Sequence, residues 1–445
     1  MKLTFGVSDK PKFGQLIIFA IQQLLAIMAA TLVVPVIVGN GMSSAAALMG
    51  AGLGTLVYVL FTKKKSPVFL GSSFAFIGSM FAAFAGGVSM ALGYLGLIIG
   101  AVFAGLVYVV IAIIVKIAGV GWINKLMPAV VIGPTVAIIG LSLAGNAVGD
   151  LQTGAAAAHP LICVLCGLVA LFVTILSSTY GKKMVKLIPF IIGILAGYAV
   201  SLIFTLIGNA LEIDALKVLS FDAFTALVAD GVNLSTFIAV PEYTFVTAFK
   251  GCAELTPAYV GAVAVAYIPV AFVVFAEHIA DHKNISSIIE KDLLEEPGLS
   301  RTLLGDGVGS MVGAFFGGCP NTTYGESVAC VAITGNASVA TIIAAAIGAI
   351  LISFLSPFIA FVNSIPKCVM GGICMALYGF IAVSGLKMIK NVNLEENKNL
   401  FVVSVILIAG IGGLSLTFGA VTITPVASAL ILGIITNLIL SKKSN

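Results

Sequence analysis

Charged residues are scarce in this chain of 445 residues, because Asp, Glu, Lys and Arg together make up only 9% of it. A soluble domain carries about 25% charged residues, so the chain lacks the charge to cover a surface that faces water. Hydrophobic residues make up 60% of the sequence, and the mean hydropathy is +1.18. The composition excludes a soluble globular protein and indicates a protein of the lipid bilayer.

Histidine and cysteine are also few, with three and seven residues. Cys163 and Cys166 form a C-x-x-C pattern, but they lie in an apolar run without a second pair, which is typical of packing residues. We therefore expect no metal site and no disulfide. The sequence also shows no cluster of histidines or nucleophiles that an intramembrane enzyme would need. We predict a protein that is not an enzyme and has no cofactor.

Long apolar runs recur along the chain, at 14–38, 94–115, 161–176, 187–207 and 401–417. Each approaches or exceeds the ~17–25 residues that span a bilayer as a helix, and the first is too long for a signal peptide. We expect an all-α polytopic membrane protein with about fourteen transmembrane segments, in the inner or plasma membrane of the cell.

The distribution of basic residues predicts the orientation. With a cytoplasmic N-terminus, 19 of the 22 Lys and Arg residues fall on the inside, and only Lys217, Lys250 and Lys367 fall outside (19 + 3 = 22). Basic residues concentrate in cytoplasmic loops, so both termini are predicted to be cytoplasmic. The net charge of +4 reflects this topology and does not suggest a nucleic-acid partner.

A polar connector at about 208–258 divides the predicted segments into two halves of seven. An odd number per half makes the halves enter the membrane with opposite orientation, as in the inverted repeats of secondary transporters. "GSSFAF" (71–76) and "PNTTYG" (320–325) interrupt the third segment of each half at matching positions. Each interruption alone could be a tight loop. Together they predict short antiparallel strands that break segments 3 and 10.

The second interruption suits a broken helix chemically. Pro320 lacks an N–H and disfavours helix before it, and Thr322, Thr323 and Tyr324 favour extended backbone. Extended backbone at membrane depth needs hydrogen-bond partners inside the protein, which a second strand could supply. A helix that starts after each break points free N–H groups and its positive end at the membrane centre. The result is a site rich in donors.

Four carboxylates, Glu277, Asp281, Asp306 and Glu326, fall inside predicted segments, and no Lys or Arg does. Ionisable groups within the membrane are functional candidates by default, and a carboxyl group removed from water favours its neutral form, so it can carry a proton. For Asp281 the alternative is a helix end that reaches water, and for Asp306 it is a structural cap. A donor cradle with two carboxylates and no cation fits a small planar ligand with C=O and N–H groups, such as a nucleobase, and disfavours anions.

Several longer phrases are distinctive: "QQLLAIMAATLVVP", "GSSFAF", "AEHIADH", "KDLLEEPGLSRTLLGDG" and "GCPNTTYGES" followed by "VAITG". They resemble the nucleobase–ascorbate transporter (nucleobase:cation symporter-2) family, and within it the bacterial uracil permeases. The resemblance runs essentially end to end and implies uptake of uracil by proton symport.

The family implies a core domain that moves against a gate domain, with alternating access between them. Applied to this chain, the division is a cytoplasmic N-tail (1–14), core (15–115), gate (116–207), extracellular connector (208–258), core (259–362), gate (363–441) and cytoplasmic C-tail (442–445). Relatives also suggest a homodimer through the gate domain.

The resemblance assigns the substrate site at matching positions. Glu277 and Glu326 would accept the N–H groups of the base, and the backbones of Phe74 and Gly325 would meet its carbonyl groups. The substrate-binding candidates are Glu277, Glu326, Phe74, Gly325, Tyr324 and Ser73, and the proton-coupling candidates are Glu277, Asp281, His278 and Gln23.

The sequence departs from the family pattern at several of these places. Uracil carriers have Asn and Gly where this chain has Ser327 and Ala329, and they often have His where it has Gln23 and Asp281. Glu326 favours uracil, because purine carriers usually have Gln there. A xanthine or other purine permease therefore stays open as the alternative, and an anion exchanger or channel of the same architecture is a more distant one.

Overall fold

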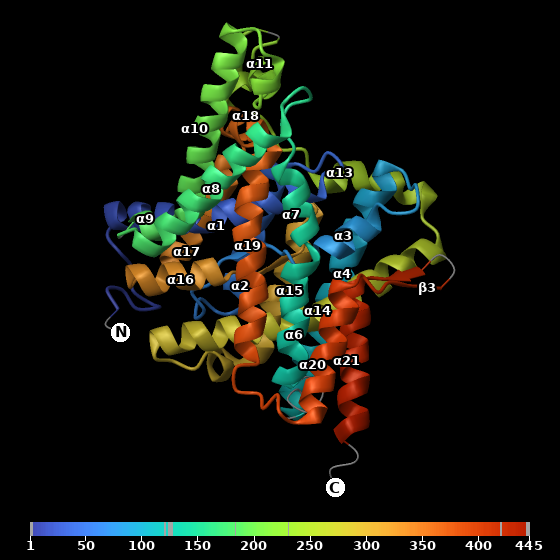
Figure 1. Cartoon of the computed structure of the whole chain (residues 1–445). Coiled ribbons are helices and arrows are strands. Elements are labelled where there is room, and N and C mark those ends of the chain that lie inside the picture. Colours follow the sequence, from blue (N-terminus) through green and yellow to red (C-terminus); the bar gives the residue numbers. More distant parts are fainter. Residues whose placement is uncertain are drawn as a thin grey trace.

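Helices make up most of the computed structural model, which describes residues 3–119, 122, 128–182, 184–229, 231–418 and 421–441 (Figure 1). Eight helical segments in this described part are long and apolar enough to cross a membrane, which confirms a multi-pass helical membrane protein. They are Phe13–Val38, Ser44–Phe61, Met90–Ala118, Ala129–Leu151, Pro160–Tyr180, Pro189–Ala210, Pro257–Ile289 and Lys367–Met388.

The first half of the chain runs from α1 to α10. Its elements are α1 (Phe13–Val38), α2 (Ser44–Phe61), β1 (Leu70–Ser72), α3 (Ile77–Ala83), α4 (Met90–Ala118), α6 (Ala129–Ser142), α7 (Ala144–Leu151), α8 (Pro160–Tyr180), α9 (Met184–Leu187) and α10 (Pro189–Ala210). The connector that follows holds only short helices: η1 (Asp214–Leu216), α11 (Asp222–Leu227), α12 (Leu234–Phe237), α13 (Thr244–Ala248) and η2 (Phe249–Glu254).

The second half begins with the longest helix. Its elements are α14 (Pro257–Ile289), η3 (Leu294–Gly298), α15 (Leu299–Gly317), β2 (Asn321–Thr323), α16 (Gly325–Thr334), α17 (Val339–Ile352), α18 (Ser356–Ser364), α19 (Lys367–Met388), α20 (Asn397–Ile411), β3 (Leu416–Phe418), β4 (Val421–Ile423) and α21 (Pro425–Ser441). Several of these helices are apolar but shorter than a full span, so the count of fourteen segments stays a prediction.

The helices pack in two groups. In one group α2 packs against α15 and α17, while α4 packs against α14 and α15. In the other, α19 packs against α6, α7 and α8, and α20 packs against α21 and α6. Each group combines helices from both halves of the chain.

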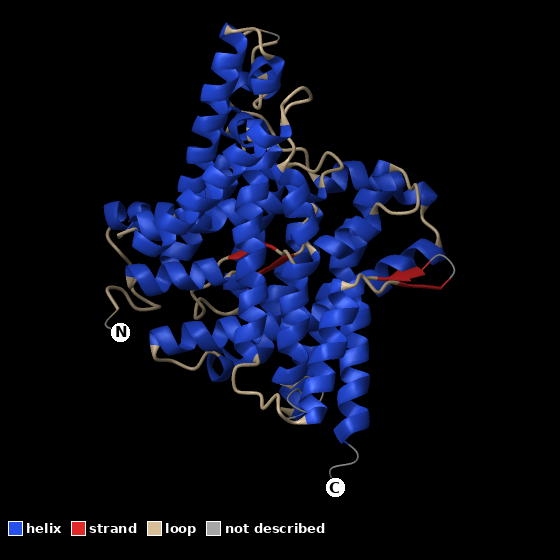
Figure 2. Cartoon of the chain, viewed as in Figure 1, coloured by secondary structure: helices blue, strands red, loops and turns tan. Residues whose placement is uncertain are grey.

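Two short strands lie at the centre of the molecule, one from each half (Figure 2). β1 and β2 pair antiparallel, with Leu70 opposite Thr323 and Ser72 opposite Asn321. The pairing continues beyond the strands, because Tyr324 N–H donates to Phe69 O (3.2 Å) and Ser73 N–H donates to Pro320 O (2.9 Å). The backbone at both interruptions of the sequence therefore has partners within the protein, as membrane depth requires.

Asn321 anchors β2 to the helices behind it. Its side-chain amide donates to Gly50 O of α2 at 3.0 Å. Glycine is required where the two helices approach, because a Cβ atom at Gly309 of α15 would lie only 2.8 Å from Gly54 O of α2. Close packing of small residues thus fixes the strand against α2 and α15.

The N-terminal segment, predicted as a cytoplasmic tail at 1–14, makes backbone hydrogen bonds to the loop after α16. Thr4 N–H donates to Gly335 O (2.8 Å), Ala337 N–H to Phe5 O (2.9 Å) and Val339 N–H to Val7 O (3.1 Å). This segment therefore holds the loop between α16 and α17, at the end of α16 opposite β2. The predicted C-tail, 442–445, lies outside the described residues.

The distribution of basic residues leads to a test of the topology. Lys64 and Asp222 are both exposed, at opposite predicted sides of the membrane. In a background without native cysteines, cysteine at Lys64 should react with an impermeant thiol reagent only after the cells are opened. Cysteine at Asp222 should react in intact cells. Labelling of both positions from outside would contradict the cytoplasmic assignment of 63–65.

Candidate functional site

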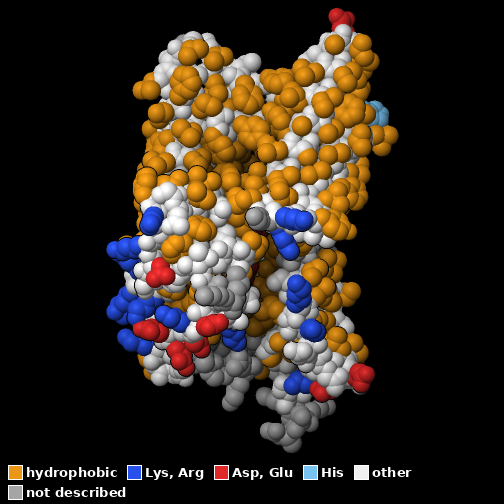
Figure 3. All heavy atoms as spheres, turned by 90° about the vertical axis from the view of Figure 1, so that its left-hand side faces the viewer, with side chains coloured by type: hydrophobic (Ala, Val, Ile, Leu, Met, Phe, Trp, Pro, Cys, Tyr) orange, Lys and Arg blue, Asp and Glu red, His pale blue; other side chains and the backbone are white. Residues whose placement is uncertain are grey.

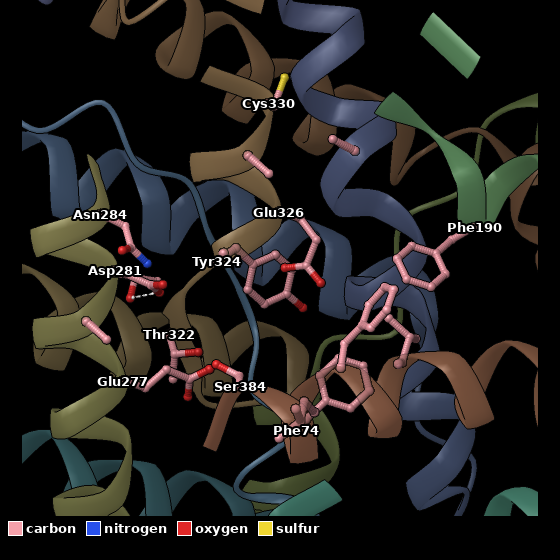
Figure 4. Close-up of a pocket in the computed structure, with 18 of the residues that line it drawn as sticks. Phe74, Phe190, Glu277, Asp281, Asn284, Thr322, Tyr324, Glu326, Cys330 and Ser384 are labelled. Carbon is pink, nitrogen blue, oxygen red and sulfur yellow. Dashed lines mark hydrogen bonds between the residues drawn. The ribbon is translucent and has the colours of Figure 1, made fainter. Parts of the chain in front are cut away.

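A cavity of about 440 Å³ lies beside the paired strands, between the two groups of helices. One wall comes from the chain after β1, from β2 and the start of α16, and from α14. The facing wall comes from α6, α10 and α19 (Figure 4). The residues that line it from this second group include Val136, Ile139, Phe190, Leu377, Phe380 and Ser384.

Three carboxylates line the cavity: Glu277 and Asp281 from α14, and Glu326 from the first turn of α16. Glu277 and Asp281 are four residues apart, so they share one face of α14. Glu277 and Glu326 are partly exposed to the cavity, and each ionised carboxylate can accept hydrogen bonds from a ligand through two oxygens. The structure thus brings the two predicted acceptors to one cavity.

Asp281 lies differently from the alternative that placed it near water at a helix end. It is buried, and its Oδ2 accepts a hydrogen bond from Thr323 Oγ1 at 2.9 Å (Figure 4). The contact joins α14 to β2 because Thr323 is the last residue of that strand. Asp281 is therefore a cavity residue that also connects two elements of the site.

Phe74, Ser73 and Tyr324 line the cavity as well. The ring of Phe74 meets Tyr378 of α19 edge to face, with centroids 6.2 Å apart. The Tyr324 hydroxyl donates to Ser72 O at 2.7 Å, so this side chain contributes its ring to the enclosure while its polar end binds β1. Ser73 is buried, and its hydroxyl has no hydrogen-bond partner among the described residues.

Gly325 is the first residue of α16, and it is exposed to the cavity. The first N–H groups of a helix have no partner within the helix, and the positive end of the helix dipole lies there. The free N–H groups at this end of the ten-residue helix α16 can therefore donate hydrogen bonds to a carbonyl oxygen of a ligand. Donors at Gly325 and acceptors at Glu326 thus adjoin on one short stretch of chain.

Gln23 does not line the cavity. It is buried in α1, and its amide Nε2 donates to Ser327 Oγ. The same hydroxyl accepts the N–H of Phe69 at 3.0 Å, just before β1. Two positions that differ from the family pattern therefore contact each other, and Ser327 joins α16 to both α1 and the chain that enters β1.

This contact predicts a loss of stability in Ser327→Ala. The change leaves the buried Phe69 N–H and the Gln23 amide without their acceptor, and each unsatisfied buried group costs about 1–3 kcal/mol. We expect a lower midpoint of thermal unfolding in detergent, with Ser327→Thr, which keeps the hydroxyl, as the matched control. Equal midpoints for the wild type and Ser327→Ala would contradict this role.

Asp306 and His278 form a buried pair away from the cavity. His278 Nδ1 and Asp306 Oδ2 are 2.6 Å apart, and His278 Nε2 lies 3.0 Å from Thr302 Oγ1. Asp306 lies in the middle of α15, so the alternative of a structural cap is wrong. His278 is fully buried within α14, and neither residue lines the cavity.

Lys186 of α9 lines the cavity, which corrects the expectation of a site without any cation. The sequence placed this lysine in a loop, but the fold brings α9 to the cavity. Ser178, Asn284 and Met388 also line the cavity near the ends of their helices.

Lys and Arg side chains gather on the lower half of the face in Figure 3, whereas the upper half is almost entirely hydrophobic.

The fold and the cavity define a class of protein: a multi-pass helical membrane transporter with a site between two helix groups. The chain belongs to the permease family, because the model of that family (Xan_ur_permease, "Permease family") matches residues 14–418.

Curated relatives cover nearly the whole chain. A uracil permease of Bacillus caldolyticus is 38% identical over 99% of this chain and 95% of its own length. A uracil permease of Escherichia coli K12 is 35% identical over 96% and 92%. The putative pyrimidine permease RutG of the same strain is 31% identical over 98% and 91%.

Solved structures share the fold at low sequence identity. The transmembrane domain of the cyanobacterial bicarbonate transporter BicA has a TM-score of 0.63 and 13% identity, covering 97% of this chain and 99% of that one. The murine anion transporter Slc26a9, in its inward-facing state, has a TM-score of 0.62 and 11% identity over 98% and 69%. At this identity the likeness shows the architecture alone.

Proposed function

We propose that this protein imports uracil into the cell by proton symport. The observation that carries the proposal is the pairing of acceptors and donors in one cavity: Glu277 and Glu326 face it beside the N-terminus of α16. Uracil presents two N–H groups and two carbonyl oxygens, so carboxylates and helix N–H groups complement it. The names of the similar uracil permeases support the same substrate.

We further propose that the cavity lies between a core and a gate domain that alternate its access. The core is assigned to 15–115 and 259–362, the gate to 116–207 and 363–441, with fourteen segments in a 7+7 inverted repeat. The packing of the helices in two groups supports this division. Lys186 and Met388 line the cavity, and both lie on the side that the predicted topology assigns to the cytoplasm, which supports a cavity reached from that side.

We infer the co-transported ion from the charge of uracil and of the residues that line the cavity. Uracil is neutral near pH 7, so its accumulation needs a co-transported ion. Three carboxylates line the cavity, and a carboxylate can take up and release a proton. We assign the proton as that ion, with the plasma membrane as the location and a homodimer through the gate domain as the assembly.

Uptake of labelled uracil in cells without their own carriers tests the proposal. Uptake should rise in acidic medium, collapse with a protonophore, and be competed by unlabelled uracil more strongly than by purines. Uptake that ignores the protonophore and follows external sodium would overturn the proton. Failure of unlabelled uracil to compete would overturn the substrate.

A xanthine or other purine permease is the second candidate. The cavity volume of about 440 Å³ leaves room for a two-ring base. Stronger competition by xanthine than by uracil in the same assay would favour it. An anion exchanger is the weaker alternative, because the described residues line the cavity with three carboxylates and only one lysine.

A further inference from the structure

A second, much smaller cavity lies behind β2, on the side away from the substrate cavity. Its volume is about 10 Å³, and its polar lining consists of Tyr108, Ser310, Asn321 and Thr322. Thr322 lines both cavities, so β2 is the wall between them. The side chains come from α4, α15 and β2, which are all fixed by close packing.

Two polar atoms in this lining are unsatisfied. The Tyr108 hydroxyl and Asn321 Oδ1 are buried and have no hydrogen-bond partner among the described residues. The amide Nδ2 of Asn321 donates to Gly50 O, and Oδ1 is the other polar atom of this side chain, which anchors β2. Buried polar groups are nearly always hydrogen-bonded, since an orphaned one destabilises the folded state.

The size and polarity of the cavity identify the ligand class. A cavity of about 10–15 Å³ holds one water molecule, and a buried water needs two to four polar partners. Tyr108 and Asn321 supply two, and Ser310 and Thr322 line the same space. We propose that this cavity is a binding site for a single water molecule that bridges Tyr108 to Asn321 and thereby supports β2 as a wall of the substrate cavity.

Tyr267 provides a matched control. Its hydroxyl is also buried without a partner among the described residues, but Tyr267 does not line the small cavity. A bound water donates and accepts hydrogen bonds at Tyr108, whereas Tyr267 lines neither of the two cavities described above. The two tyrosines are fully buried, or nearly so, with 4% of Tyr108 and 0% of Tyr267 exposed.

Hydroxyl-radical footprinting by X-ray pulses on the purified full chain tests occupancy, since radicals form on bound water. Tyr108 should be oxidised at least about fivefold faster than Tyr267, although both are buried. Equal, slow oxidation of the two rings would overturn the proposal. The measurement needs no substrate, so its outcome does not depend on the assignment of uracil.

Two variants, Tyr108→Phe and Tyr267→Phe, test whether the water supports β2 as a wall of the substrate cavity. This second test uses uracil binding and therefore rests on the proposed function. Loss of one hydrogen bond to the water predicts a uracil Kd about two- to tenfold higher in Tyr108→Phe. The Kd in Tyr267→Phe should stay within twofold of the wild type. An unchanged Kd in Tyr108→Phe would show that the water does not support the wall. A Kd that depends on sodium in the wild type but not in Tyr108→Phe would mean a cation site, which would overturn the water.

Discussion

Glu326→Gln should weaken uracil binding by about ten- to a hundredfold or more. Glu326 lies in the first turn of α16 and faces the cavity beside Gly325. The change keeps the size of the side chain but replaces two acceptor oxygens by one acceptor and one donor. A hydrogen bond to a charged group contributes about 1.5–3 kcal/mol, which corresponds to that range of Kd.

The measurement is titration calorimetry on the purified protein. The family resemblance implies Gln at this position in purine carriers, so binding of xanthine should fall less than binding of uracil. Glu296→Gln makes the same chemical change on the exposed surface, outside the cavity, and should leave the Kd unchanged. Unchanged affinity in Glu326→Gln would remove this residue from the site.

Several residues singled out in the sequence share one cavity, where chemistry and position coincide. Pro320 and the run of β-favouring residues after it predicted a short strand where β2 lies, and the matching interruption at 71–76 predicted its partner near β1. A carboxylate inside an apolar run, as at Glu277, is unusual enough to indicate function by itself. Seven of the predicted residues therefore line one cavity: Ser73, Phe74, Glu277, Asp281, Tyr324, Gly325 and Glu326.

The facing wall could not be predicted. Phe190, Phe380 and Ser384 lie in ordinary apolar helices, and nothing local distinguishes them from lipid-facing or core residues. Their place in the site follows from how two groups of helices pack, which is a long-range property. Lys186 was missed for the same reason, because a lysine between two apolar runs reads as a loop until the fold brings α9 to the cavity.

For some residues, contacts between distant segments differ from what the sequence suggested. Asp306 follows a glycine and precedes another, which suggests a cap, yet it lies within α15 and binds His278. Gln23 and Ser327, two departures from the pattern that the family resemblance implies, contact each other. Each departure alone suggests a change in the proton path. Their contact instead joins α1 to α16, and through Ser327 to the chain that enters β1.

Glu277→Gln should abolish accumulation of uracil while equilibration continues. Glu277 faces the cavity from the middle of α14, four residues before Asp281, and its neutral replacement cannot take up or release a proton. One proton driven by ~150 mV supplies roughly 3.5 kcal/mol, enough to concentrate a neutral solute roughly 300-fold. Without coupling the ratio of internal to external uracil should approach one.

Accumulation and counterflow in vesicles with an imposed proton gradient separate coupling from binding. Glu277→Gln should lose accumulation at least as severely as Glu326→Gln, because it removes the coupling group as well as an acceptor for the base. Exchange of internal for external uracil, at concentrations above the raised Kd, should persist, since exchange needs no net proton movement.

Asp306→Asn, outside the cavity, should lower folding yield through its contact with His278 and leave the accumulation by each folded molecule nearly intact. Accumulation by Glu277→Gln at the wild-type ratio would show that the proton is carried elsewhere. Asp281, held by Thr323 at the same cavity, would then be the carboxylate to test next.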